Sequence, residues 1–314
     1  MAILMPHCET GVVRPYIYWH NRGLQSNPGA PLILVSDRGR LYQLFKYVVY
    51  AALTANIFIF FSQESAASPY RFADGFALEE IILGFAATID TVAWVVLLLM
   101  FELETYVLDD NRFTPRVTWS LHGLRAVCYG FIVYSFYGYT SKMISLSGMA
   151  ALPGVNDLCS LADGAWAYSV AYEEFVVITL NNCSSFSDAS VFLKFPEMTA
   201  VIDQTGYRNT MGLAWVDVIN SAVWLLVVFV LEVDVRLQER NLLTGTALKI
   251  SNTSKYVLYS ILVMALIYWT AEGGLVDSWD SFLWLVAFIF IELNVFDWRQ
   301  ESIEEQQALN QPAL

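Results

Sequence analysis

The sequence predicts an all-α integral membrane protein with six transmembrane helices, arranged as three repeated helical hairpins. Two observations point to this fold class. Of the 314 residues, 56% are hydrophobic and only 15% are charged, whereas soluble domains carry about 25% charged residues. In addition, a short pattern of charged and aromatic residues occurs three times, each time within hydrophobic stretches long enough to cross a bilayer.

The repeated pattern is basic at its start and acidic at its end. The first half is a Lys or Arg four residues before a Tyr, as in Lys46–Tyr50, Arg125–Tyr129 and Lys255–Tyr259. The second half is an Asp or Asn, a Trp four residues later and a Glu eight residues after that, over residues 90–102, 220–232 and 280–292. Each copy therefore predicts one helical hairpin.

The helices follow in order from the apolar windows. Six windows reach spanning length, which is roughly 20 residues: 42–61, 79–105, 118–140, 211–235, 254–271 and 275–296. The apolar runs are continuous rather than alternating, which favours helices over barrel strands. We predict hairpin 1 at 42–110, hairpin 2 at 117–237 and hairpin 3 at 254–298, with an N-terminal segment at 1–41 and a tail at 299–314.

Hairpin geometry is consistent with opposite charges at equal depth. In the third copy, 18 residues separate Lys255 from Gly273 in the Gly273-Gly274 turn, and 19 separate Gly273 from Glu292. At about 1.5 Å per helical residue, the two charges return to the same end of the hairpin. We therefore expect the basic and acidic residues at this end to pair, either within each hairpin, as Lys46 with Glu102, Arg125 with Glu232, and Lys255 with Glu292, or across to the next hairpin.

The distribution of basic residues predicts the orientation. Thirteen of the 17 Lys and Arg residues fall on one side of the predicted membrane, and only Arg71, Lys142, Lys194 and Arg208 fall on the other. By the positive-inside rule, both termini are cytoplasmic. We predict a multi-pass protein of a plasma or inner membrane, with segment 141–210 on the extracytoplasmic side.

Segment 141–210 is the one long connection between the predicted spans. It contains a strand-like stretch, 168–180, and two of the four cysteines, Cys159 and Cys183. Because an oxidising compartment lets cysteines pair, we predict a Cys159–Cys183 disulfide that holds a small outer cap. Cys8 and Cys128 lie elsewhere and are not expected to form a bridge. A connection of this length is the best candidate for a recognition surface.

The chain is acidic, with a formal net charge of −13. This charge argues against a nucleic-acid partner, which requires a basic face. Acidic outer loops would concentrate cations at that surface. The alternative is that these loops are acidic simply because basic residues are retained on the cytoplasmic side.

The candidate site is a set of polar residues at equivalent positions within the predicted membrane. Asp90, Asn220 and Asp280 each share a helix face with the Trp four residues later, which lies about 40° round the helix. A carboxylate inside the membrane is a functional candidate by default. We predict a central cavity lined by these three residues, with the three charge pairs acting as a gate.

Parts of this pattern also have a purely structural interpretation. The charges at the hairpin ends are also typical of interfacial anchors that fix the depth of a helix. We interpret Trp94, Trp224 and Trp284 as packing residues rather than binding residues.

The sequence favours a transporter or channel for a small cation, either a proton or a metal ion. The alternative is a non-catalytic structural or assembly subunit of a larger membrane complex. A membrane enzyme ranks third, since acid clusters can do acid–base chemistry. The chain has no phosphate loop, dinucleotide fingerprint, HExxH or GxSxG motif, and no catalytic residue, cofactor or metal site is predicted. The expected partners are the lipid bilayer, a small cation, and membrane proteins or further copies of the chain.

Overall fold

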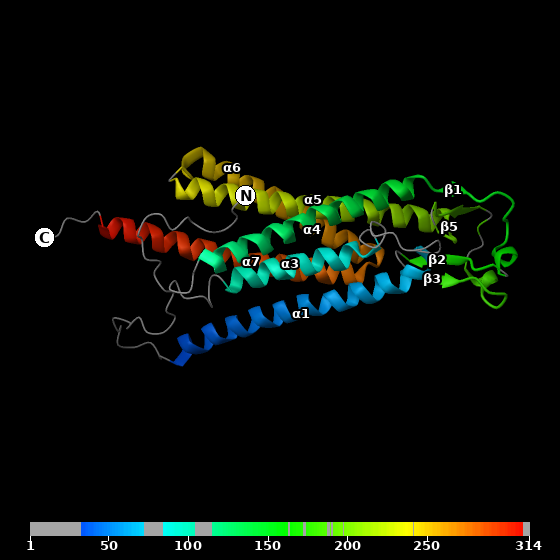
Figure 1. Cartoon of the computed structure of the whole chain (residues 1–314), viewed down its shortest axis with the longest axis horizontal. Helices are drawn as coiled ribbons and strands as arrows, with labels where there is room; N and C mark the ends of the chain where they lie inside the picture. Colours follow the sequence, from blue (N-terminus) through cyan, green and yellow to red (C-terminus); the bar gives the residue numbers. More distant parts are fainter. Residues whose placement is uncertain are drawn as a thin grey trace.

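The structure is a computed structural model, and it describes residues 33–71, 84–103 and 115–309, apart from residues 163, 172–173, 187–188, 190, 197 and 241. Most of the predicted N-terminal segment 1–41 and the final residues of the predicted tail lie outside these ranges. So do parts of the predicted outer connection of hairpin 1 and of the second span. The described residues form long helices and one small sheet (Figure 1).

The helices are longer than the apolar windows that predict them. They are α1 (Ile33–Arg71), α3 (Ala86–Glu102), α4 (Pro115–Ser147), α5 (Gln204–Glu239), α6 (Gly245–Glu272) and α7 (Leu275–Leu309). Extending an existing helix adds one hydrogen bond for each residue fixed, so polar residues that flank an apolar window readily continue it. For the same reason, part of the tail predicted at 299–314 belongs to α7.

Three of these helices, α1, α5 and α6, are long and apolar enough to cross a membrane. Membrane association is therefore supported by length and composition. The count of six spans, the repeated hairpins and the orientation of the chain stay predictions.

The helices form a closed ring. Each helix contacts the next one along the chain, from α1 to α3, α4, α5, α6 and α7, and α7 packs back against α1. They run along one long axis, and the strands lie at one end of it (Figure 1). We call this end the cap end, and the opposite end, where Lys46 and Glu102 lie, the ion-pair end.

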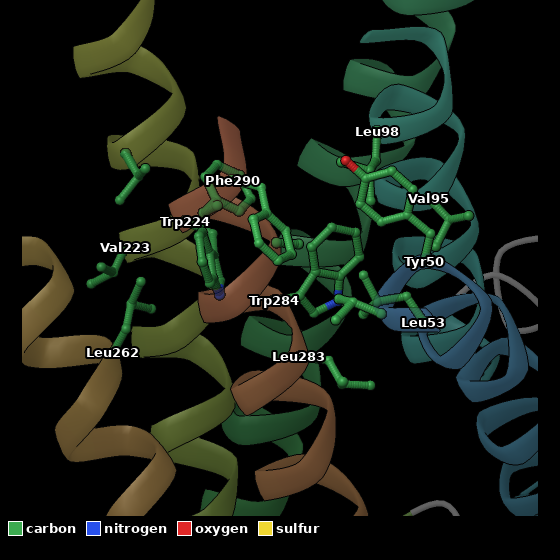
Figure 2. Packing of buried hydrophobic residues seen from close by; sticks show 14 of the residues in the cluster. Tyr50, Leu53, Val95, Leu98, Val223, Trp224, Leu262, Leu283, Trp284 and Phe290 are labelled. Carbon is green, nitrogen blue, oxygen red and sulfur yellow. The ribbon is translucent and has the colours of Figure 1, made fainter. Parts of the chain in front are cut away.

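A continuous apolar cluster fills the ring toward the ion-pair end. Its members come from five helices and include the fully buried Leu53 and Leu262. Figure 2 shows these leucines, together with Trp224 and Trp284, pointing into the space between the helices. Because lipid tails are as apolar as leucine, packing of this kind holds membrane helices together mainly through van der Waals contact.

The connection between α6 and α7 is a tight glycine turn at the predicted position. Helix α6 ends at Glu272, and Gly273 follows with φ of 88°, a left-handed conformation that glycine adopts without steric cost. The N–H of Gly274 donates to the carbonyl of Trp269 at 2.8 Å, which satisfies one of the last carbonyls of the helix.

The prediction of a purely helical fold is wrong at the cap, residues 148–203. Five strands form one sheet in the order β1-β4-β5-β2-β3, and only β2 and β5 pair in parallel. They are β1 (Ala150–Ala151), β2 (Ala167–Ala171), β3 (Glu174–Val177), β4 (Phe192–Lys194) and β5 (Ala200–Asp203). The strand-like stretch 168–180 contains most of β2 and all of β3. The cap is shorter than the predicted insertion 141–210 because α4 continues to Ser147 and α5 begins at Gln204.

The predicted disulfide is confirmed within the cap. Cys159 and Cys183, 24 residues apart in sequence, are joined beside a small core that includes Leu158 and Ile178. A second apolar cluster, including Ile202 and Ala214, joins the sheet to the helix ends. The cap is therefore packed against the helix ring rather than only tethered to it.

Candidate functional site: an acidic cavity in the helix ring

A cavity of about 470 Å³ lies at the cap end of the ring, between the helices and the sheet. Its wall contains the three predicted site residues, Asp90, Asn220 and Asp280. It also contains four acids that we did not predict as site residues: Glu64, Glu174, Asp217 and Asp277. Lys142 is the one basic residue among the lining residues. The structure thus brings the predicted residues together in a strongly acidic cavity.

The lining residues of α3, α5 and α7 form levels that follow the repeated pattern. The predicted residues 90, 220 and 280 are each followed directly by a hydroxyl residue, Thr91, Ser221 or Ser281. Three positions before them lie Ala87, Asp217 and Asp277, and four positions after them lie Trp94, Trp224 and Trp284. We call residues 87, 217 and 277 the first level, residues 90, 220 and 280 the second level, and the three tryptophans the third level. At about 1.5 Å per residue, neighbouring levels are about 4.5 to 6 Å apart.

Glu64 of α1 supplies the carboxylate that α3 lacks at the first level. Its Oε1 accepts the N–H of Ala87 at 2.8 Å, and its Oε2 accepts the N–H and the hydroxyl of Thr88 at 3.1 and 2.6 Å. A carboxylate at the start of a helix satisfies free N–H groups and complements the helix dipole. Glu64 is therefore fixed by α3, close to the position that Asp217 and Asp277 occupy in the other two helices.

The carboxylates of the second level differ in their partners. Asn56 of α1, 1% exposed, donates from Nδ2 to Oδ1 of Asp280 at 2.7 Å. Trp94 and Tyr139 hydrogen-bond with the Asp90 side chain. Three buried oxygens in the cavity wall nevertheless accept no hydrogen bond from any described residue: Asp90 Oδ1, Asn220 Oδ1 and Ser281 Oγ.

Tryptophan side chains form the floor of the cavity. The ring centroid of Trp94 lies 6.4 Å from that of Trp224 and 6.1 Å from that of Trp284. Phe288 packs against Trp224 with 4.5 Å between ring centroids. The packing interpretation agrees with these contacts, but the same side chains also line the cavity. Beyond this floor lies the apolar cluster of Figure 2.

Beyond the cluster, the first and third copies of the pattern make the same contacts. Lys46 Nζ lies 2.6 Å from Glu102 Oε1, and Tyr50 donates its hydroxyl to Glu102 Oε2 at 3.4 Å. In the third copy, Lys255 Nζ lies 3.3 Å from Glu292 Oε2, and the Tyr259 hydroxyl lies 3.4 Å from Glu292 Oε1. Two tyrosines of the pattern, Tyr50 and Tyr259, thus contact the acids as well.

The middle copy is arranged differently. Glu232 pairs with Arg236, one turn further along α5. Asp234 pairs with Lys255 of the third copy at 2.9 Å and accepts the Ser251 hydroxyl at 2.6 Å. Arg125 and Glu232 are both buried, and the contact that we expected between them stays a prediction.

Some of the unpredicted lining residues could have been found from the sequence. The hydroxyls at 91, 221 and 281 follow the repeated Asp or Asn directly, and Asp217 and Asp277 precede it by the same three residues. Aligning the three copies over a longer window reveals both positions. No such signal identifies Glu64, Tyr139 or Lys142, since they come from helices that lack the Asp-to-Trp half of the pattern.

The cavity is suited to holding a positively charged molecule, because its carboxylates outnumber its single ammonium and its floor is aromatic. Within the described ranges, no group of three or more His, Cys, Asp or Glu side chains is arranged to hold a metal ion. Comparisons of the chain with protein-family models, with curated proteins and with solved structures find no match.

Proposed function

We propose that the protein is a membrane transporter or channel that takes a small cation into the acidic cavity and passes it along the axis of the helix ring. The observation that carries this proposal is the convergence of Asp90, Asn220 and Asp280 on one cavity. Three equivalent positions of a repeated pattern would not meet in this way if each served only its own helix.

Electrostatics favours a cation over other small solutes. A cavity lined by charges of one sign and surrounded by low-dielectric walls concentrates counter-ions. Asp90 and Asp280 lie in helices that we propose to span the membrane, where charged side chains are costly and mark ion pathways. An anion would meet six carboxylates and a single ammonium.

The ion-pair end would act as the inner gate. The tryptophan floor and the apolar cluster separate the cavity from the Lys46–Glu102 pair. Twelve residues separate Asp90 from Glu102, or about 18 Å along a helix. A cation can cross this distance only if the floor and the pairs rearrange, so we propose alternation between a cavity open at the cap end and one open at the other end.

The closed ring supports the larger architecture that we propose, with six spans, three hairpins, cytoplasmic termini and an extracytoplasmic cap. Within the ring, α1, α4 and α6 alternate with α3, α5 and α7. The tryptophans of the latter three helices meet at the floor. Approximate threefold symmetry of this kind is expected when one hairpin has been copied twice.

A flux experiment tests the proposal. The purified chain is placed in liposomes, and uptake of protons and of metal cations is recorded with trapped fluorescent indicators. We expect flux above that of empty liposomes, and its loss when Asp90→Asn and Asp280→Asn are combined. Glu272→Gln is the matched control, because Glu272 is an exposed acid at the end of α6 that does not line the cavity. Absence of flux, or equal flux in the double variant and the control, would refute transport of protons and metal cations.

One observation favours the second candidate, a subunit of a larger membrane complex. The cap exposes Val177 and Leu180, and β3 is an edge strand of the sheet. Exposed apolar side chains beside an edge strand are typical of a protein contact surface. This candidate predicts that the chain co-purifies with a partner in fixed stoichiometry from its native membrane, and that Leu180→Glu breaks the association. Recovery of the chain alone in mild detergent counts against it.

A further inference from the structure

Three oxygen atoms in the cavity wall carry information about the cation. Asp90 Oδ1 comes from α3, Asn220 Oδ1 from α5 and Ser281 Oγ from α7, and none of them has a hydrogen-bond partner among the described residues. Ser281 is only 3% exposed. Buried polar atoms are nearly always hydrogen-bonded. Each of these oxygens has almost no exposed surface of its own, while its residue lines the cavity. We therefore expect small side-chain rotations to bring the oxygens to donors inside the cavity, either on water or on a ligand.

The arrangement of these three oxygens matches a ligand group that has several N–H donors. Positions 90, 220 and 281 lie within one residue of equivalence in the repeated pattern, so they provide one acceptor from each of three helices at nearly the same level. A primary ammonium group has three N–H donors and no acceptor. A neutral alcohol brings only one donor, and a quaternary ammonium brings none.

The floor supplies a second feature that suits an organic cation. Trp94, Trp224 and Trp284 lie one helical turn beyond the acceptors, a spacing of about 6 Å along a helix. A cation within about 6 Å of a tryptophan ring centroid is attracted by the negative face of the ring, and tryptophan is the strongest aromatic partner. Carboxylates and aromatic rings thus lie at adjacent levels of the cavity, close enough to contact one bound cation.

Size is the third argument. The volume of about 470 Å³ falls within the range of small-molecule sites, about 300 to 1,000 Å³. It is far larger than a bare ion requires. Apolar lining from Phe60, Val176 and Phe175 nearer the cap provides a surface for a short hydrocarbon body.

We propose that the cation is a protonated primary amine with a short apolar body, whose ammonium group binds between Asp90, Asn220 and Ser281 above the tryptophan floor. The proposal rests on the proposed function, since it names the substrate class of the same cavity. It nevertheless concerns binding, which can be measured without transport.

Calorimetric titration of the full chain in nanodiscs tests the proposal, with n-butylamine as the probe at a pH where it is protonated. The panel also contains n-butanol, tetramethylammonium, potassium and calcium. We expect n-butylammonium to bind at least tenfold more tightly than n-butanol or tetramethylammonium. Asp90→Asn and Asn220→Leu should each weaken binding about tenfold, because hydrogen bonds to a charged group are stronger than hydrogen bonds between neutral groups. Glu272→Gln should leave binding unchanged.

Trp224 provides an independent variant if Asp90→Asn fails to fold, because it lines the floor of the cavity. Trp224→Phe keeps an aromatic ring at the floor and should weaken binding only a few-fold, whereas Trp224→Leu should weaken it further. Thermal unfolding of each variant verifies that it is folded before titration.

Each outcome separates the two proposals. Binding of n-butylammonium that depends on Asp90 and Asn220 supports the amine site, even if liposomes show no flux, in which case transport alone fails. If potassium or calcium binds and n-butylammonium does not, the amine site is refuted while cation transport stands. Equal affinity for tetramethylammonium would refute the role of the N–H donors. Failure of every cation in the panel to bind would mean that only water satisfies the three oxygens, and it would refute the amine site, whereas transport of protons is decided by the flux experiment.

Discussion

Buried polar side chains are paired at one end of the helix ring, whereas some of them lack a partner at the other end. At the ion-pair end, Lys46 and Glu102 have side chains only 3% and 9% exposed, and they lie in contact at 2.6 Å. At the cap end, the cavity wall contains buried oxygens of Asp90, Asn220 and Ser281 that no described residue satisfies. Both ends are built from the same three copies of one pattern.

This difference indicates that the two ends of the pattern have different roles, one in holding the helices together and the other in binding. Where Lys46 meets Glu102 and Lys255 meets Glu292, the opposite charges neutralise each other and hold the helices together at this end. One turn beyond the tryptophans, toward the cap, the same helices leave three buried oxygens without a partner among the described residues, which costs stability and is typical of a binding site. Removing single groups from each end tests this contrast.

The largest expected effect is at the ion-pair end. Lys46→Met should lower the free energy of unfolding by about 3 to 5 kcal/mol, because it leaves the Glu102 carboxylate buried without its ammonium partner. Thermal unfolding in detergent measures the loss. Lys249→Met is the matched control, since Lys249 is exposed on α6 and the same substitution there should change little.

The double variant Lys46→Met with Glu102→Gln sharpens this prediction. Removing both charges eliminates the unpaired carboxylate, so most of the lost stability should return. If the double variant is as unstable as Lys46→Met alone, then packing of the lysine chain rather than the charge holds this end together, and the contrast with the cavity loses its electrostatic basis.

The disulfide gives the next largest effect, and we expect it to be confined to the cap. Replacing Cys159 and Cys183 with serine opens a loop of 24 residues in sequence separation, and a loop of this length corresponds to about 3 kcal/mol of chain entropy. Limited proteolysis should therefore cut residues 148–203 faster, while the helix ring stays protected. Equal cleavage of the helices would show that the ring depends on the cap.

The sequence was sufficient to predict the parts of this molecule that obey a simple period. The apolar windows predicted the helices, and the alignment of acids and tryptophans predicted which positions meet in the cavity. The paired cysteines predicted the disulfide. All three follow from local spacing, and none required knowledge of the contacts between helices.

The remainder depended on tertiary contacts. The short strands of the cap, such as the two residues of β1, carry too little pattern to be distinguished from turns. Glu64 and Asn56 act on α3 and α7 from a neighbouring helix, and only the folded ring brings them there. The pairing of Asp234 with Lys255 crosses from one copy of the pattern to the next, an arrangement that the sequence left open without identifying Asp234 as the partner.

At the cavity we expect the opposite sign of effect. Ser281→Ala should raise the free energy of unfolding by about 1 kcal/mol, because it removes a buried hydroxyl that lacks a partner among the described residues, and such groups cost about 1 to 3 kcal/mol. Ser278 is the matched control on the same helix, since its hydroxyl donates to the Leu275 carbonyl at 3.1 Å. Ser278→Ala should therefore be neutral or destabilising. A loss of stability in Ser281→Ala would mean that the hydroxyl is already satisfied, either within the protein or by water in the cavity.

The smallest expected effect distinguishes between two partners for Glu232. Arg236 lies one turn away and its side chain is 52% exposed, so water screens the pair, and Arg236→Met should cost less than about 1 kcal/mol of unfolding free energy. Arg125 is buried, and the repeated pattern makes it the equivalent of Lys46. If it holds the Glu232 carboxylate as Lys46 holds Glu102, Arg125→Met should cost several times more than Arg236→Met in the same thermal unfolding experiment. Equal costs would mean that the middle copy of the pattern lacks a pair equivalent to Lys46 and Glu102, and that two of the three copies are closed by such a pair at this end.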